Sequence, residues 1–169
     1  MREEPIALFA EIVRNNGNLF DLLQSDYVVV NERLAQHYGI PGVFGTHFRK
    51  VTINAESHRG GVLTTAAMLT MNSDGTDSHP LKRGVWLLER ILQDPPPPPP
   101  ANVPKVDLTD PRILEMTLKE RIADHRNKPA CASCHSRLDP WGIAFENYDA
   151  MGGFRTKIKN TPVDRKSTR

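Results

Sequence analysis

Apolar residues recur at the three- and four-residue spacing of helices over most of the chain. The stretches that carry such a stripe are residues 4–38, 62–69, 80–92, 110–126 and 143–151. Two stretches differ, because residues 28–30 are consecutive valines and residues 48–53 briefly alternate between apolar and polar side chains, as short strands do. The hydrophobic pattern therefore predicts a mainly α protein with at most short strands.

Glycine and proline mark the predicted ends of the helices. Gly39 stands where a left-handed C-terminal cap is expected, and Pro41 confirms the stop. Pro80 suits the first turn of the next helix. Residues 139–142 predict a turn, and the glycines at residues 152–153 end the last predicted helix.

A row of prolines at residues 95–100 separates two apolar helical stretches. Such a row forms a polyproline II rod, here roughly 19 Å long at about 3.1 Å per residue. Two interpretations are open: a ligand for an SH3- or WW-type groove, or a stiff spacer between packed modules. The apolar stretches that flank the row closely favour the spacer.

Composition and charge exclude several classes of protein. Basic residues number 22 and acidic residues 20, a net charge of +2, so no strong field attracts nucleic acid or membrane lipid. No apolar run approaches the length of a membrane span. The 2 cysteines lie in one short motif, whereas a disulfide-stapled secreted domain distributes more of them along the chain.

Residues 131–135 read Cys-Ala-Ser-Cys-His, which is the attachment sequence of c-type haem. On a helical turn, the two intervening residues bring both thiols to one edge of a porphyrin, and the imidazole that follows can bind the iron. The sequence therefore predicts covalent haem c on Cys131 and Cys134, with His135 as the proximal iron ligand.

The second axial position of the iron is open. His125 is the first candidate, because it shares the apolar face of the helix predicted over residues 110–126 and a buried imidazole needs a partner. A core histidine bonded to a backbone carbonyl is an equal alternative. Met151 is the second candidate, and the alternative is that its side chain simply packs in the core. A vacant position would suit peroxidase-like chemistry, and the further candidates in the preceding segment are Met68, Met71 and His79.

Two alternatives dispense with haem. The set Cys131, Cys134, His135 and His125 contains four possible zinc ligands. Adjacent Cys134 and His135 would be strained around one tetrahedral ion, and the spacing fits no usual zinc finger. A dithiol–disulfide site is the other alternative, but no βαβ pattern surrounds the motif.

Several segments outside the haem motif carry a family resemblance. Residues 59–64 read Arg-Gly-Gly-Val-Leu-Thr, and residues 78–89 read Ser-His-Pro-Leu-Lys-Arg-Gly-Val-Trp-Leu-Leu-Glu. Residues 145–149 read Phe-Glu-Asn-Tyr-Asp, downstream of Leu138-Asp139-Pro140. With the proline row and the haem motif, they resemble planctomycete-type cytochrome c proteins built from domains of unknown function.

The resemblance implies a helical cytochrome-c-like haem module preceded by a small helical domain, with the polyproline spacer between them. Residues 1–50 are then the helical end of a preceding domain, and residues 51–104 are a small, mostly helical domain ending in the proline row. Residues 105–169 form a helical haem-binding domain that is truncated. Members often have Arg-Met-Asp-Pro after the motif, so Leu138 excludes a methionine ligand at that position.

Location and partners follow from the same resemblance. Covalent haem attachment belongs to an exported compartment, yet the chain begins without the apolar core of an export signal. We therefore expect a periplasmic or otherwise exported multidomain protein, with its signal upstream of this fragment. Its expected partners are the flanking domains and a redox partner protein, with no nucleic acid.

Two classes of haem function are open, and the sequence does not decide whether the chain is an enzyme. An electron-transfer module predicts a haem iron with both axial positions filled. A peroxidase- or oxygenase-like oxidoreductase, linked through the resemblance to polysaccharide-degrading bacteria, needs polar groups beside a bound oxidant. One short loop offers such groups, which are Asp77, His79, Lys82 and Arg83. The alternative is that these residues only form a solvated loop and a helix cap.

Overall fold

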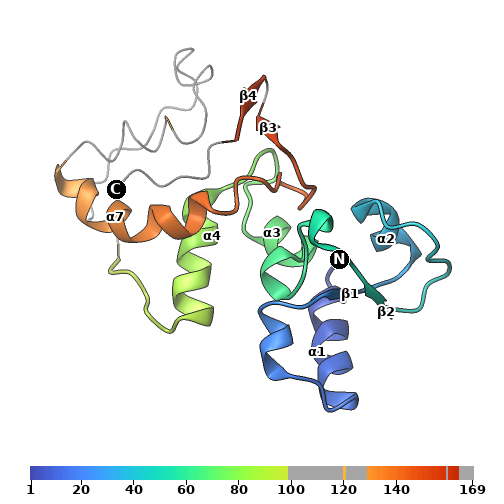
Figure 1. Cartoon of the computed structure of the whole chain (residues 1–169). Coiled ribbons are helices and arrows are strands. Elements are labelled where there is room, and N and C mark those ends of the chain that lie inside the picture. The colour runs from blue at the N-terminus through green and yellow to red at the C-terminus, as the bar shows by residue number, and fades with distance from the viewer. Residues whose placement is uncertain (99–119, 121–128, 159, 164–169) are drawn as a thin grey trace. The chain divides into compact units, whose positions relative to one another are not determined.

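Two units make up the chain in the computed structural model, which describes residues 1–98, 120, 129–158 and 160–163 (Figure 1). Unit 1 contains Met1–Ser78 and Tyr148–Phe154. Unit 2 contains His79–Asn147 and Arg155–Arg169. The polypeptide therefore returns from unit 2 to unit 1 for a short segment near its C-terminal end. The predicted domain boundaries stay predictions.

Unit 1 combines short helices with one antiparallel pair of strands. Its elements are α1 (Glu4–Arg14), the 3-10 helix η1 (Leu19–Leu22), β1 (Tyr27–Val30), α2 (Glu32–Tyr38), β2 (Arg49–Thr52), the 3-10 helices η2 (Ala55–Ser57) and η3 (Val62–Thr64), and α3 (Ala66–Met71). Strand β1 pairs with β2 in a register that sets Val28 opposite Val51. Gly39 caps α2 with φ +68°, which confirms the predicted left-handed cap.

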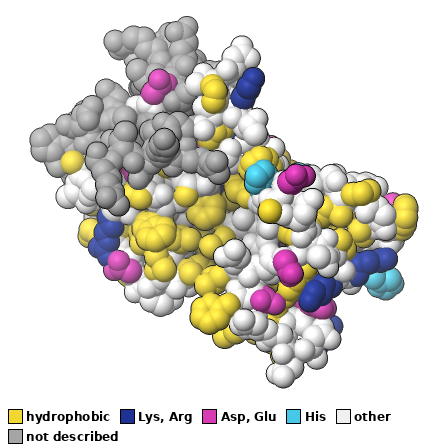
Figure 2. Space-filling model, viewed as in Figure 1, with side chains coloured by type: hydrophobic (Ala, Val, Ile, Leu, Met, Phe, Trp, Pro, Cys, Tyr) yellow, Lys and Arg dark blue, Asp and Glu magenta, His cyan; other side chains and the backbone are white. Residues whose placement is uncertain are grey.

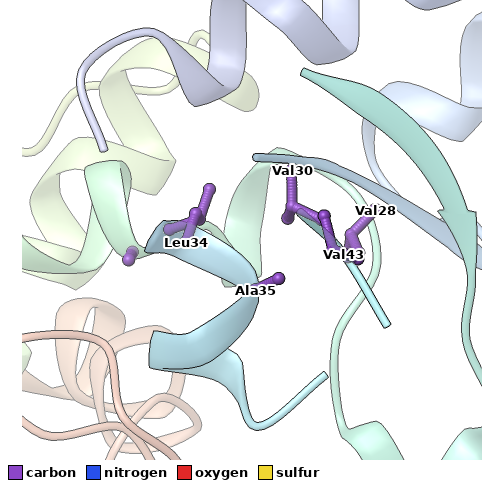
Figure 3. Close-up of a cluster of buried hydrophobic side chains, with 6 residues drawn as sticks. Val28, Val30, Leu34, Ala35 and Val43 are labelled. Atoms are coloured by element: carbon purple, nitrogen blue, oxygen red, sulfur yellow. The ribbon is translucent and has the colours of Figure 1, made fainter. Parts of the chain in front are cut away.

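Strand β1 lies at the centre of unit 1, because all its side chains are buried. Side chains of successive residues point to opposite faces of a strand. One face packs with the cluster Val28, Val30, Leu34, Ala35, Val43 and Ala66 (Figure 3). The other face packs Tyr27 and Val29 against Leu8 and Ile12 of α1. Burial on both faces explains why consecutive valines form a strand here.

The returning segment Tyr148–Phe154 is tied to unit 1 by polar and aromatic contacts. The Tyr148 hydroxyl donates a hydrogen bond to the carbonyl of His58, and the Phe154 ring stacks on the His58 ring at 4.0 Å between centroids. The guanidinium of Arg59 donates to the carbonyl of Gly152 at 2.6 Å. Residues 58–59 therefore anchor this segment.

Arg59 covers a buried polar network that contains Tyr38 and Glu4. The Arg59 guanidinium stacks 3.6 Å from the centroid of the Tyr38 ring, and burial lowers the pKa of Arg59. The Tyr38 hydroxyl donates to the carboxylate of Glu4 and accepts from the backbone N–H of Ala66 at 2.6 Å. Burial raises the pKa of Glu4 despite these hydrogen bonds.

We expect the Glu4→Gln variant to gain stability relative to wild type as the pH rises. The folded chain holds the Glu4 proton more tightly than the unfolded chain. This contribution is fully present below the ordinary pKa of 4.5 and is lost as the pH rises through the folded-state pKa. The variant, uncharged at every pH, should therefore be more stable relative to wild type near neutral pH than in acid.

Urea unfolding followed by circular dichroism at several pH values measures this difference. The matched control is Glu3→Gln, which removes an exposed carboxylate from the neighbouring position. Its stability should differ from wild type by the same small amount at every pH. Parallel curves for wild type and the Glu4 variant would contradict the expectation.

Unit 2 is built on two helices that cross (Figure 1). They are α4 (Pro80–Trp86), which continues as the π-helix η4 (Leu87–Ile91), and α7 (Pro129–Ile143). A short antiparallel pair, β3 (Lys157–Ile158) and β4 (Thr161–Pro162), follows. Pro80 is the first residue of α4, as predicted, and the His79 side chain caps that helix.

The prediction of a mainly α fold is wrong. Two antiparallel strand pairs are present among the described residues, and less than half of the structure is helical. Strand pairing depends on residues distant in the chain, such as Tyr27 and Thr52, so local apolar spacing does not reveal it. The predicted helix over residues 110–126 and the proline row beyond residue 98 lie outside the described residues, except for Glu120.

Two local predictions around the C-terminal helix are also wrong. Residues 139–142 were predicted as a turn, but α7 runs through them to Ile143 with Pro140 inside it. Residues 144–147 form turns instead of the predicted helix, and Tyr148 pairs with Phe154 as a β-bridge. The Asp149 carboxylate accepts from the backbone N–H groups of Met151 and Gly153, so it competes with a helical ladder.

Candidate haem-attachment site

The Cys-Ala-Ser-Cys-His motif lies within α7. Positions 134 and 135 each lie three or four residues from both 131 and 138, so the four positions share one face of this helix. Cys134 is half-buried and has a free thiol, and His135 is buried. The side chain of Cys131 lies outside the described residues.

The imidazole of His135 is held by Asp139, one helical turn further along α7. Nδ1 of His135 lies 2.9 Å from Oδ1 of Asp139, and the two side chains are 9% and 1% exposed. A carboxylate can only accept, so Nδ1 carries the proton of this hydrogen bond. The nitrogen that would meet an iron is therefore Nε2.

Two glycines let α4 approach α7 closely. A Cβ added to Gly142 would lie 2.1 Å from the carbonyl oxygen of Pro80, and one added to Gly84 would lie 2.7 Å from that of Leu138. Both distances are shorter than real Cβ contacts, so only glycine fits. The crossing holds the half of α7 that follows His135.

A buried arginine and a surface ion pair add to this arrangement. Arg83 of α4 is fully buried and donates to the carbonyl of Phe145 at 3.0 Å, just beyond the end of α7. Two residues after the motif, Arg137 forms an ion pair with Asp94, which follows η4. Hydrophobic side chains are visible over α4 in Figure 2, and Leu92 and Trp141 are exposed large ones in unit 2.

Comparison with protein families assigns most of this chain. The family model described as PSCyt3, protein of unknown function (DUF1588), matches residues 59–158. The chain belongs to the PSCyt3 family. A second model, PSD4, protein of unknown function (DUF1592), matches residues 1–40. No curated protein and no solved structure matches the chain.

The match confirms the family resemblance at a coarse level. Both names are typical of planctomycete cytochrome-c-like domain families. In the structure, residues 1–40 of the PSD4 match and residues 59–78 of the PSCyt3 match lie in the same unit. The PSCyt3 match also continues through residues that the sequence analysis divided between two domains.

In this PSCyt3 chain, the candidates for the second axial ligand differ in location and exposure. His125 lies outside the described residues. Met151 belongs to unit 1, is 49% exposed, and contributes its backbone carbonyl to a 2.9 Å hydrogen bond with His37. Met68 is buried and Met71 is exposed, both in α3 of unit 1.

The polar groups proposed to face an oxidant have structural contacts. Nδ1 of His79 accepts from the backbone N–H of Lys82 at 3.4 Å, and the Asp77 carboxylate accepts from that of Ser78 at 2.8 Å. Arg83 bonds to Phe145, as described above. The Asp77 contact is that of a turn, and the His79 contact is that of a helix cap. Arg83 is a buried cation bonded to the backbone.

The alternatives without haem depend partly on side chains outside the described residues. Within the described part of the chain, no three His, Cys, Asp or Glu side chains gather as a metal-ligand cluster. Zinc binding would need Cys131 and His125, and both side chains lie outside that part.

Among the described helices, none has the length and apolar character to cross a membrane.

Asp139 is the site residue that the sequence analysis missed. The predicted turn over residues 139–142 removed it from the helix that carries the motif. The available signal was the spacing of four residues between His135 and Asp139, which brings two side chains together only on a helix.

Proposed function

We propose that this PSCyt3 chain binds haem c covalently through Cys131 and Cys134 and serves in electron transfer, with His135 as the proximal iron ligand. The observation that carries the proposal is the buried imidazole of His135, directly after Cys134 and fixed through Nδ1 by Asp139. Ligating histidines typically donate their second ring N–H to a carboxylate or carbonyl in this way.

The donor set fits the chemistry of haem c. Two thiols can form thioether bonds, and Nε2 of His135 is the nitrogen suited to iron because Nδ1 is engaged by Asp139. Bound haem would supply one-electron redox chemistry, while the chain supplies attachment, burial and electrostatics. The glycine-mediated crossing of α4 and α7 would keep the imidazole in place when the iron changes its charge.

For the second axial position we propose His125 first and Met151 second. His125 follows from the apolar face predicted for residues 110–126. Met151 has an exposed side chain near the end of the family match. Histidine–methionine ligation would raise the reduction potential relative to two histidines, so the potential distinguishes the two candidates.

The proposal extends to location and partners. Since covalent haem attachment belongs to exported compartments, we infer a periplasmic or otherwise exported protein with an export signal upstream. The flanking domains and a redox protein would be its partners. The contacts of His79 and Arg83 are structural, so no specific observation favours the oxidoreductase alternative.

The test is a pyridine haemochrome assay on the chain produced together with c-haem maturation proteins. We expect the absorption of a thioether-linked haem that survives denaturation, and ferric spectra of a low-spin iron. A chain without covalent haem would contradict haem binding. A high-spin ferric spectrum with rapid peroxide-dependent oxidation of a small donor would contradict electron transfer and favour the oxidoreductase.

A further inference from the structure

We propose that Asp139 tunes the haem ligand: its carboxylate, hydrogen-bonded to His135, would increase electron donation from the imidazole to iron and so favour the ferric over the ferrous state. The inference rests on the proposed function. It goes further by naming the residue that tunes the site and by predicting that its carboxylate lowers the reduction potential. Asp139 is a positioning residue, because it acts through His135.

The geometry is that of a buried hydrogen bond from an imidazole N–H to a carboxylate. Nδ1 of His135 and Oδ1 of Asp139 are 2.9 Å apart, within the range of hydrogen bonds to ionised acceptors. Asp139 is 1% exposed, so water competes little for its carboxylate. Low local polarity strengthens such a bond relative to the same pair in water.

The position of the carboxylate is determined by the backbone. His135 and Asp139 are four residues apart on α7, so the helix itself brings them together. The next turn contains Gly142, which lies against the backbone of α4 at Pro80. Asp139 therefore lies between the proximal ligand and a rigid crossing, and its distance to His135 cannot relax easily.

A carboxylate partner differs from a neutral carbonyl in one physical respect. It draws the Nδ1 proton toward itself and raises the basicity of the imidazole at Nε2. A more basic ligand donates more electron density to iron, which stabilises the ferric state over the ferrous state. Hydrogen bonding around the axial ligand is an established way for a protein to tune the potential of a haem.

This assignment limits the partners of the module. A haem whose ferric state is stabilised has a lower midpoint potential than the same haem without the carboxylate. Its electron donor therefore needs a correspondingly lower potential, and a carrier of higher potential would be the acceptor.

The test compares the haem-loaded wild type with Asp139→Asn, which keeps the shape of the side chain and removes its charge. Two matched controls remove other carboxylates of unit 2. Glu146→Gln neutralises a buried one that lies 3.5 Å from Arg155, and Asp94→Asn neutralises the exposed partner of Arg137. Haem content comes first, by pyridine haemochrome, and the midpoint potential follows by spectroelectrochemistry.

We expect Asp139→Asn to weaken the preference for ferric over ferrous iron by about tenfold, an upward shift of about 59 mV for a one-electron couple. Both controls should shift the midpoint by much less. An unchanged midpoint in haem-loaded Asp139→Asn would overturn the inference while leaving haem binding intact. A shift of the same size in Glu146→Gln would also overturn it, because general loss of charge would then explain the effect.

A second measurement uses the wild type and applies even when the variant fails to fold. Resonance Raman spectroscopy after photolysis of the carbon monoxide complex reports the iron–histidine stretching frequency. A basic, Asp139-bonded imidazole should give a high frequency, and a frequency typical of a neutral imidazole would overturn the inference. A wild type that carries no haem would overturn the proposed function and this inference with it.

Discussion

Covalent haem should be lost completely when Cys131 and Cys134 are both replaced by alanine. Each thiol can form one thioether bond to the porphyrin, so the double variant has no covalent link. The single variant Cys134→Ala should keep a haem through the remaining bond. Haem staining after denaturing electrophoresis measures covalent attachment directly, because only linked haem travels with the chain.

Two further variants separate attachment from ligation. Ser133→Ala changes an exposed residue between the cysteines and should leave the haem content unchanged. His135→Ala should lose the proximal iron ligand, so its ferric spectrum should change in any haem-loaded fraction. If the double cysteine variant still carried covalent haem, attachment through this motif would be disproved, together with the role assigned to α7.

Replacing Gly142 by alanine should destabilise unit 2 strongly. The new Cβ would lie 2.1 Å from the carbonyl oxygen and 2.6 Å from the carbonyl carbon of Pro80. Both atoms belong to backbone, so no side-chain movement relieves the overlap. Overpacking of this kind costs about 3 kcal/mol or more when helices have to separate. Urea unfolding followed by circular dichroism measures the loss.

The matched control is Gly17→Ala, because the nearest atom to its Cβ would be 3.4 Å away and its backbone is not left-handed. Its stability should stay close to that of the wild type, within about 1 kcal/mol. In a haem-loaded Gly142 variant, the bond from His135 to iron should also be lost at a lower urea concentration, since α7 carries His135. A Gly142→Ala protein as stable as wild type would contradict the crossing of α4 and α7.

Short-range features were predicted well from the sequence. Gly39 and Pro80 stand where local backbone chemistry requires a cap and a first helical turn, and the structure has both. The strand over residues 49–52 was also expected from its alternation. These predictions succeed because each depends on a few adjacent residues.

Two predictions failed for different reasons. The apolar spacing over residues 143–151 predicted a helix, but hydrogen bonds to the Asp149 carboxylate and the bridge between Tyr148 and Phe154 favour turns. The mainly α prediction failed because strands pair between segments that are distant in the chain. The paired strands of unit 1, β1 and β2, are separated in the chain by the helix α2 and the loop that follows it.

The sequence by itself determined the Cys-x-x-Cys-His motif and the cofactor that it predicts. Those properties follow from residue type and near spacing alone. Only the structure decided that one helix runs from Pro129 through Asp139 to Ile143, which brings Asp139 to His135, and that Gly84 and Gly142 hold α7 against α4. Burial and backbone approach arise between segments far apart in the chain, so no local pattern contains them.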